Sequence, residues 1–219
     1  MKFFKVFLVV GVLGIALVFA GTQPASADVA MSFTSAIISS QSQLSLGWVF
    51  TTNSAVTVDA LGYYDDQGDG FITPHTVGIF DSVGNLLTSA SLSAGTGNPL
   101  NGSFRYASIS PYTLAAGQTF VIAATTEGPS DPWAYGNAYI SDGLVTLPGF
   151  TVNPAISIGS NAARYVYQND NVLQDPTSHY SNFTVYAGPN FQTVPLPPSL
   201  LLLGSGLLGL MGLRRFKKS

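Results

Sequence analysis

Short apolar runs alternate with turn-forming clusters through the middle of the chain. The runs are rich in Val, Ile, Thr, Phe and Tyr, and groups of Gly, Pro, Asn and Asp separate them. This spacing is typical of antiparallel strands, and no stretch shows the sustained period of an amphipathic helix. We therefore expect an all-β domain, a single antiparallel β-sandwich of jelly-roll-like form. The expected strands are 44–51, 55–63, 76–81, 86–92, 103–110, 119–125, 138–140, 164–167 and 183–186.

Four stretches predict local detail. Val56 and Val58 alternate with polar neighbours, which indicates a half-buried strand, whereas residues 120–124 are apolar on both faces and indicate a central strand. Residues 81–85 separate two runs and predict a hairpin turn. Residues 127–163 are richer in Pro, Gly and Asn, which predicts long loops on one rim.

The N-terminus has the pattern of a secretory signal peptide. Two lysines precede an uncharged apolar run over residues 6–21, and small residues at Ala25 and Ala27 form a cleavage motif. We expect export by the Sec machinery and removal of residues 1–27, so that the mature chain begins at Asp28. The alternative is an uncleaved N-terminal anchor.

The C-terminus carries a second apolar run, residues 199–213, between prolines and a basic tail. As a helix this run reaches about 22 Å, short of the roughly 30 Å hydrocarbon core of a bilayer. The positive-inside rule would keep the tail in the cytoplasm and the middle of the chain outside. The pattern predicts a transmembrane helix, and a buried core helix is the alternative.

The order of these C-terminal parts resembles the PEP-CTERM sorting signal of Gram-negative bacteria. The residues that carry the resemblance are Val194, Pro195, Leu196, Pro197 and Pro198, then the apolar run, then Arg214, Arg215 and two lysines. Leu196 stands where the family usually has Glu. The resemblance implies processing by an exosortase, an integral-membrane enzyme, after a transient stay in the inner membrane. It also implies delivery to the cell envelope or to an extracellular matrix in species that make exopolysaccharide and biofilm.

The expected domains are therefore a signal peptide (1–27), an ectodomain (28–193) and a sorting signal (194–219). Several segments of the ectodomain together resemble an exported bacterial β-sandwich domain of unknown function, namely 46–50, 55–62, 68–70, 75–81, 84–87, 104–111 and 114–121. This second resemblance covers residues 44–125. It implies a fold and no chemistry.

Charge and cysteine content exclude several classes of protein. The chain has no Cys, which excludes disulfides and thiolate metal sites. Residues 28–193 contain two arginines, Arg105 and Arg164, against eleven acids, a formal net charge of −9. A nucleic-acid partner is not expected without a basic surface.

Little in the sequence indicates catalysis. No Ser lies in a G-x-S-x-G elbow, and the two histidines, His75 and His179, are expected to be surface or hydrogen-bonded residues. Trp48 is expected in the core. Arg105 and Arg164 are expected to pair with acids or to pack their stems. A pair of Asp residues could serve a secreted glycan hydrolase, but nothing marks such a pair. The leading interpretation is a non-enzymatic surface or matrix protein.

Two candidate binding sites remain. Trp133, Tyr135 and Tyr139 lie in a Pro/Gly-rich stretch beside Asn and Asp, which is typical of a lectin-like rim that binds extracellular polysaccharide. The alternative is that these rings close the end of the sandwich. The other candidate is the segment 65–70, in which Asp65, Asp66 and Asp69 could hold calcium. Its alternative is an exposed turn, and otherwise no cofactor is expected.

Overall fold

The structure is a computed structural model, and its described part lies between Ala27 and Val194. The described residues are 27–41, 43–126, 131–136, 138–140, 143–145, 147–168, 170–179 and 185–194. Residues 27–194 form one compact unit. The expected signal peptide, apart from Ala27, and the sorting signal from Pro195 onward lie outside the described residues. None of the helices in the described ranges is long and apolar enough to cross a membrane.

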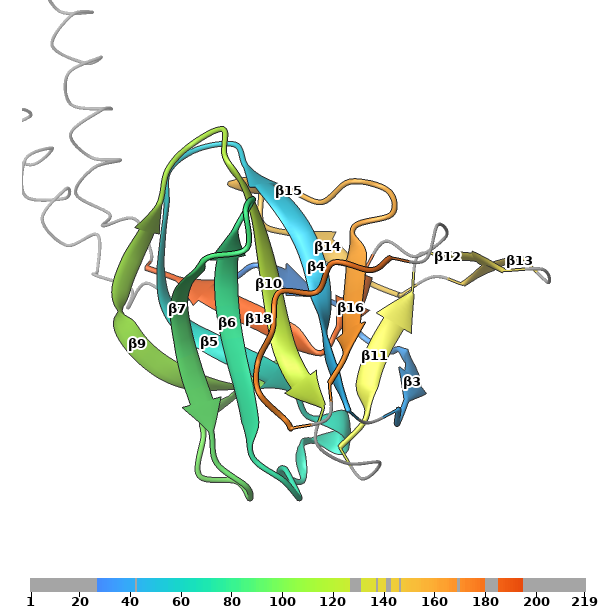
Figure 1. The fold of residues 1–219 in the computed structure, drawn as a ribbon. Coiled ribbons are helices and arrows are strands. Elements are labelled where there is room, and N and C mark those ends of the chain that lie inside the picture. The colour runs from blue at the N-terminus through green and yellow to red at the C-terminus, as the bar shows by residue number, and fades with distance from the viewer. Residues whose placement is uncertain are drawn as a thin grey trace, which may run out of the picture. The chain divides into compact units, whose positions relative to one another are not determined.

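The described residues form antiparallel sheets and contain no α-helix, which confirms the expected all-β class. Five strands make one sheet of this part of the chain (Figure 1). In spatial order they are β1 (Asp28–Val29), β18 (Pro189–Thr193), β5 (Val56–Tyr64), β9 (Phe104–Leu114) and β8 (Leu100–Asn101).

A second large sheet packs against the first. Its order is β15 (Ile156–Ser157), β4 (Leu44–Thr52), β10 (Thr119–Thr126), β6 (His75–Asp81) and β7 (Leu86–Leu92), and β16 (Ala163–Tyr167) also pairs with β4. Smaller sheets join β17 (Val185–Ala187), β11 (Trp133–Gly136) and β3 (Ile37–Ser39), then β12 (Ala138–Ile140) and β13 (Gly143–Val145), then β14 (Thr151–Val152) and β2 (Met31–Ser32).

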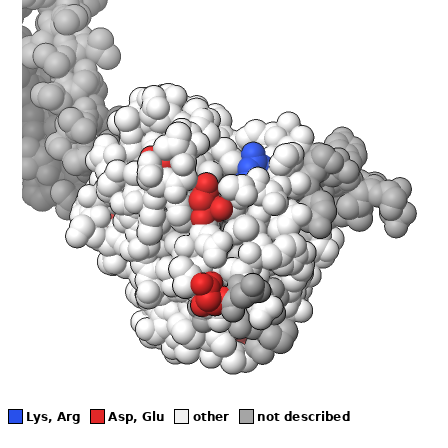
Figure 2. All heavy atoms as spheres, in the orientation of Figure 1, with Lys and Arg blue, Asp and Glu red and all other residues white. Residues whose placement is uncertain are grey.

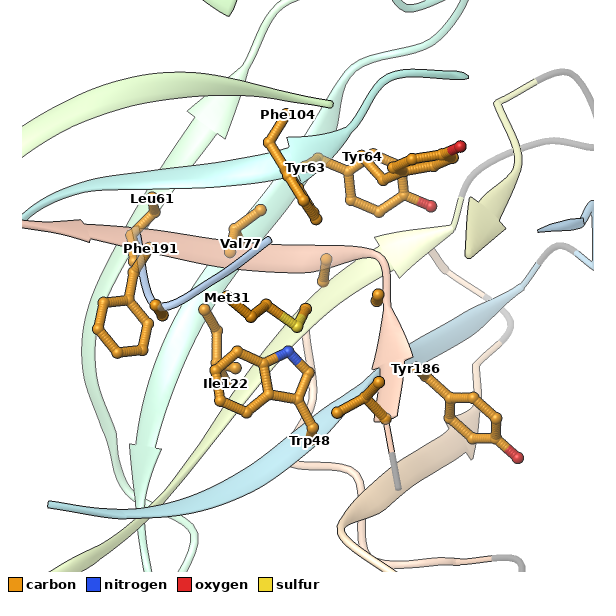
Figure 3. Packing of buried hydrophobic residues seen from close by; sticks show 14 of the residues in the cluster. Met31, Trp48, Leu61, Tyr63, Tyr64, Val77, Phe104, Ile122, Tyr186 and Phe191 are labelled. Carbon is orange, nitrogen blue, oxygen red and sulfur yellow. The ribbon is translucent and has the colours of Figure 1, made fainter. Parts of the chain in front are cut away.

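The core lies between the two large sheets. Phe191 of β18 faces Trp48 and Phe50 of β4, with ring centroids 6.1 and 5.2 Å apart. Figure 3 shows Trp48, Ile122 and Phe191 among the packed side chains. Trp48 has no exposed surface, which confirms its expected place in the core. Burial of such aromatic rings supplies much of the free energy that holds two sheets together.

Gly47 allows β4 and β10 to pair closely. A Cβ atom at this position would lie 1.8 Å from the carbonyl oxygen of Ile122. Any side chain would therefore force the strands apart at the centre of the sheet, where Gly47 pairs with Ala123. The glycine between Leu46 and Trp48 is thus required by packing and not by a turn.

Most of the expected strands are present, and the burial patterns of Val56, Val58 and residues 120–124 are confirmed. The hairpin turn is confirmed at Asp81, whose N–H donates to the Asn85 carbonyl at 3.0 Å. The expectation of long loops over 127–163 is wrong, because β11, β14 and β15 lie there together with the β12–β13 pair. These strands are two to four residues long, and all of them except β12, which was expected at 138–140, escape a search for longer apolar runs.

Candidate functional site

The loop between β5 and β6 is held by a buried ion pair. The Arg105 Nε atom donates to the Asp65 carboxylate, which also accepts the Gly70 N–H at 3.2 Å. The remaining guanidinium donors bind carbonyl oxygens of Thr96, Asn98 and Gly68 at 2.8 to 3.1 Å. Both side chains are nearly fully buried. Arg105 therefore pairs with an acid, as expected, and fixes the loop over residues 65–70.

The two other acids of this loop have different surroundings. Asp66 accepts a hydrogen bond from the Tyr64 hydroxyl at 3.1 Å, and Asp69 is exposed. Burial, followed by the charge and the hydrogen bond of Asp66, raises the pKa of Tyr64 to about 12. Gly70 has a φ of +100°, and a Cβ there would lie 2.8 Å from the backbone of Gly95. The loop is thus tightly packed at Gly70 and exposed at Asp69.

Two cavities flank the loop. One, of about 250 Å³, is lined by Asp65, Asp66, Asp69 and Asp131 together with Ile38, Tyr64 and neighbouring residues. The other, of about 390 Å³, lies between the loop, the segment 34–36 and β8. In the described residues no three His, Cys, Asp or Glu side chains are arranged to hold a metal ion. Arg105 already neutralises the charge of Asp65, so the three acids of the loop do not form a single metal-binding centre.

Asp131 connects the segment before β11 to the segment before β6. Its carboxylate accepts the N–H groups of Ile72 and Thr73 at 2.8 and 2.7 Å, and the Thr73 hydroxyl at 2.8 Å. The Nε2 atom of His75 lies 3.3 Å from the same carboxylate. Burial alone would raise the pKa of Asp131, but these interactions outweigh it and lower the pKa to about 2. The ionised carboxylate of Asp131 therefore holds the segment before β11 against the segment before β6, and we call this set of contacts the Asp131 clamp.

His75 is part of the core and not of an open site. It is 1% exposed, and its Nδ1 atom lies 2.9 Å from the Thr125 carbonyl oxygen, which can only accept a hydrogen bond. Its ring stacks on Tyr63 of the other sheet, with centroids 3.9 Å apart and planes 9° apart. The His75–Asp131 pair resembles a catalytic dyad in composition, but the His75 ring is buried between the two sheets and does not line the cavity that Asp131 borders. His179 is exposed.

The predicted aromatic rim is only partly a surface. Trp133 is 6% exposed, so its ring does not lie open on a rim, and its burial agrees with the alternative that these rings close the end of the sandwich. The Trp133 ring packs edge-to-face on Tyr186 at 5.0 Å, and its Nε1 atom donates to the Gln41 carbonyl at 3.3 Å. Tyr135 is half-buried beside Trp133. Tyr139 lies in β12, and its side chain is outside the described part of the structure.

Sequence reasoning missed one exposed aromatic residue among the described residues near this site. Tyr167, at the end of β16, is 61% exposed and contacts Tyr165 edge-to-face at 5.7 Å. A signal was present, because Arg164–Tyr167 was an expected strand with aromatic residues at alternate positions. Of the sorting residues, Val194 alone is described, and its N–H donates to the Thr57 carbonyl at 2.9 Å.

Charge is sparse on the domain. Figure 2 shows one face with separate acidic areas and one small basic area surrounded by uncharged surface. Of the two arginines in the described residues, Arg105 is buried, and Arg164 binds the carbonyl oxygens of Asn161 and Ala163. Burial lowers the pKa of Arg164, and the charge of Asp175 partly offsets this.

The fold and these surfaces define an all-β, antiparallel domain. Residues 32–186, more than half of the chain, match a known family described as a domain of unknown function (DUF4082). The chain belongs to this family. No curated protein matches the chain. The family match ends within β17, so β1 and β18, which pair with each other, lie outside it.

Proposed function

We propose that the protein is an exported, non-enzymatic component of the bacterial cell surface or extracellular matrix. In this proposal residues 28–193 are a jelly-roll-like β-sandwich ectodomain between a signal peptide and a C-terminal transmembrane helix. An exosortase-type enzyme processes the chain, which passes transiently through the inner membrane of a Gram-negative cell and reaches a surface rich in exopolysaccharide.

The observation that carries this proposal is that the boundaries of the compact unit coincide with the two signals predicted from the sequence. The unit spans Ala27–Val194, and its first strand begins at Asp28, the residue that signal cleavage would leave at the N-terminus. Asp28 pairs with Thr193, so both ends of the unit lie at the same place in the sheet. The acidic middle and the basic tail agree with transfer of the middle across the membrane.

The state of the titratable groups supports a non-enzymatic role. His75 is sealed in the core, and the buried carboxylates Asp65 and Asp131 are each engaged by several donors. A hydrolase would require an accessible pair of carboxylates, one of which is free to exchange a proton. Of the acids that line the larger openings, Asp65 and Asp131 hold loop backbone in place.

Truncation tests the proposed sorting. A chain ending at Val194 keeps the bond to Thr57, so the domain should fold, reach the periplasm and appear in the soluble fraction. The full chain should appear first as a membrane-bound precursor. A chain with Ala27→Phe serves as control, because it should block signal cleavage and hold even the truncated protein at the membrane. If the full and truncated chains distribute identically between fractions, the C-terminal segment is not a sorting signal.

A further inference from the structure

Four aromatic side chains and one amide come together where three strands meet, and Tyr167 is the most exposed of the four rings. Trp133 of β11, Tyr165 and Tyr167 of β16, Tyr186 of β17 and Gln41 line a shallow depression together with Leu44 and Leu46. We call the five residues first named the aromatic patch. The depression has a volume of about 20 Å³, room for a water molecule and little more. Such a surface suits a flat ligand lying across it and not a small molecule enclosed in a pocket.

Tyr167 is exposed and yet held in place. Its ring meets Tyr165 edge-to-face at an interplanar angle of 87°, and its hydroxyl accepts a hydrogen bond from Gln41 Nε2 at 3.2 Å. Two contacts at opposite ends of the side chain restrict its rotamers. Binding to this ring therefore costs little side-chain entropy, which is the property that makes a tyrosine an effective contact residue.

Buried residues support the patch from below. Trp133 donates to the backbone carbonyl of Gln41, the residue whose side chain binds Tyr167. Tyr186 packs against both Trp133 and Tyr165. Trp133 thus positions the exposed part of the patch and does not itself present a face to solvent.

The charge of the domain selects the ligand. Among the residues that the structure describes, no Lys, Arg, Asp or Glu lines the patch, and the ectodomain has a formal net charge of −9. An anionic polymer would be repelled by this domain and would find no cation at the patch. An aromatic ring flanked by an amide suits the apolar C–H face and the hydroxyl groups of an uncharged sugar ring.

We propose that the aromatic patch binds neutral polysaccharide, with Tyr167 stacking on sugar rings and the Gln41 carboxamide contacting their hydroxyl groups. The inference rests on the proposed function, since export brings the patch to extracellular glycans. It differs from the predicted rim, because Tyr167 takes the place of Trp133 as the contacting residue.

Affinity electrophoresis of the full chain in a mild neutral detergent tests the proposal. Glucomannan, hydroxyethyl cellulose and dextran serve as neutral probes, and alginate as the anionic one. At least one neutral polymer should retard the wild-type protein, and alginate should not. Tyr167→Ala should weaken the retardation about tenfold, as loss of one stacked ring predicts. Tyr167→Phe, which keeps the ring, should retain most of it.

A second tyrosine provides the control. Tyr112 of β9 lies in the other large sheet and is half-buried, so Tyr112→Ala should leave the retardation unchanged. Thermal melts of each variant confirm folding. The proposal is overturned if no neutral polymer retards the wild type, if alginate binds as well, or if Tyr112→Ala matches Tyr167→Ala. It is also overturned if Tyr167→Ala changes only self-association in sedimentation. Binding by a chain that is not exported would instead refute the proposed function alone.

Discussion

The indole N–H of Trp48 donates a hydrogen bond to the carbonyl oxygen of Pro189 at 3.0 Å, from the middle of one large sheet to the other. This bond connects β4 to β18, the last strand of the described domain. Trp48 also touches Phe50 and Phe191. The Trp48 side chain thus connects β18 to the core in two ways, by ring packing and by a hydrogen bond. A buried indole N–H usually has such a hydrogen-bond partner.

Trp48→Ala should therefore remove most of the stability of the domain. Truncating a buried Trp costs about 3–5 kcal/mol, and the Pro189 carbonyl would be left unpaired. Trp133→Ala should cost about 3 kcal/mol, at the lower end of that range, because Trp133 is slightly exposed and lies in a small sheet. Denaturant unfolding measures both. A loss below about 1 kcal/mol for Trp133→Ala would contradict its placement in the packed interior.

Tyr63→Phe should leave the protein as stable as the wild type or slightly more so. The Tyr63 hydroxyl is buried and has no hydrogen-bond partner among the described residues. Burial, and then the charge of Asp131, raises the pKa of this hydroxyl. Removing an unpaired buried hydroxyl relieves a desolvation cost of about 1 kcal/mol or more. Tyr64→Phe is the matched control, because it removes the bond to Asp66 and should cost about 1 kcal/mol. If Tyr63→Phe destabilises the protein and Tyr64→Phe does not, the interpretation that the Tyr63 hydroxyl is unpaired is wrong.

Asp131 should make the stability of the domain sensitive to acid. Its pKa is lowered from 3.8 to about 2 in the folded protein, so the carboxylate stabilises the fold above pH 4. This contribution is lost as the pH falls from 4 toward 2. Asp131→Asn should cost about 3 kcal/mol at pH 6. The difference in melting temperature between wild type and variant should narrow below pH 4. A constant difference from pH 6 to pH 2 would show that the charge has no part in the clamp.

Calcium should not change the thermal stability of the protein. Arg105 already places a cation beside Asp65, so one of the three loop carboxylates is not free to bind a metal. Melting curves in chelator and in millimolar calcium should coincide, and Asp69→Asn should leave them unchanged. A rise in melting temperature with calcium that Asp69→Asn abolishes would restore the metal site considered from the sequence. Arg105→Ala should destabilise the loop by about 3–5 kcal/mol, because Asp65 would remain buried and unpaired.

The sequence predicts the parts of this fold that depend on long apolar runs. Strands β4 and β10 can be predicted because a long buried strand carries apolar residues on one or both of its faces. β18 was not predicted, since Pro189, Asn190 and Gln192 do not read as a strand. Asn190 is nevertheless fully buried, where its carboxamide donates to the Met31 carbonyl and accepts from the Met31 N–H. Such a polar core residue depends on a partner far away in sequence.

The candidate sites show the same limit. The sequence identified the acidic loop, but not that Arg105, some forty positions away, neutralises it. It identified aromatic residues near 133–139. Among the described side chains the ring that is largely exposed is instead that of Tyr167, on β16, which lines the same depression as Trp133 and Tyr186. Local composition predicts which residue types gather in a segment. Burial is decided by tertiary contacts that only the assembled sheets provide.

Mass spectrometry of the intact protein from the surface or matrix fraction of the native bacterium tests the central claim most directly. Export and sorting predict a mature chain that begins at Asp28 and lacks the basic residues Arg214, Arg215, Lys217 and Lys218. Recovery of a chain that still carries Met1 or this basic tail would contradict the account.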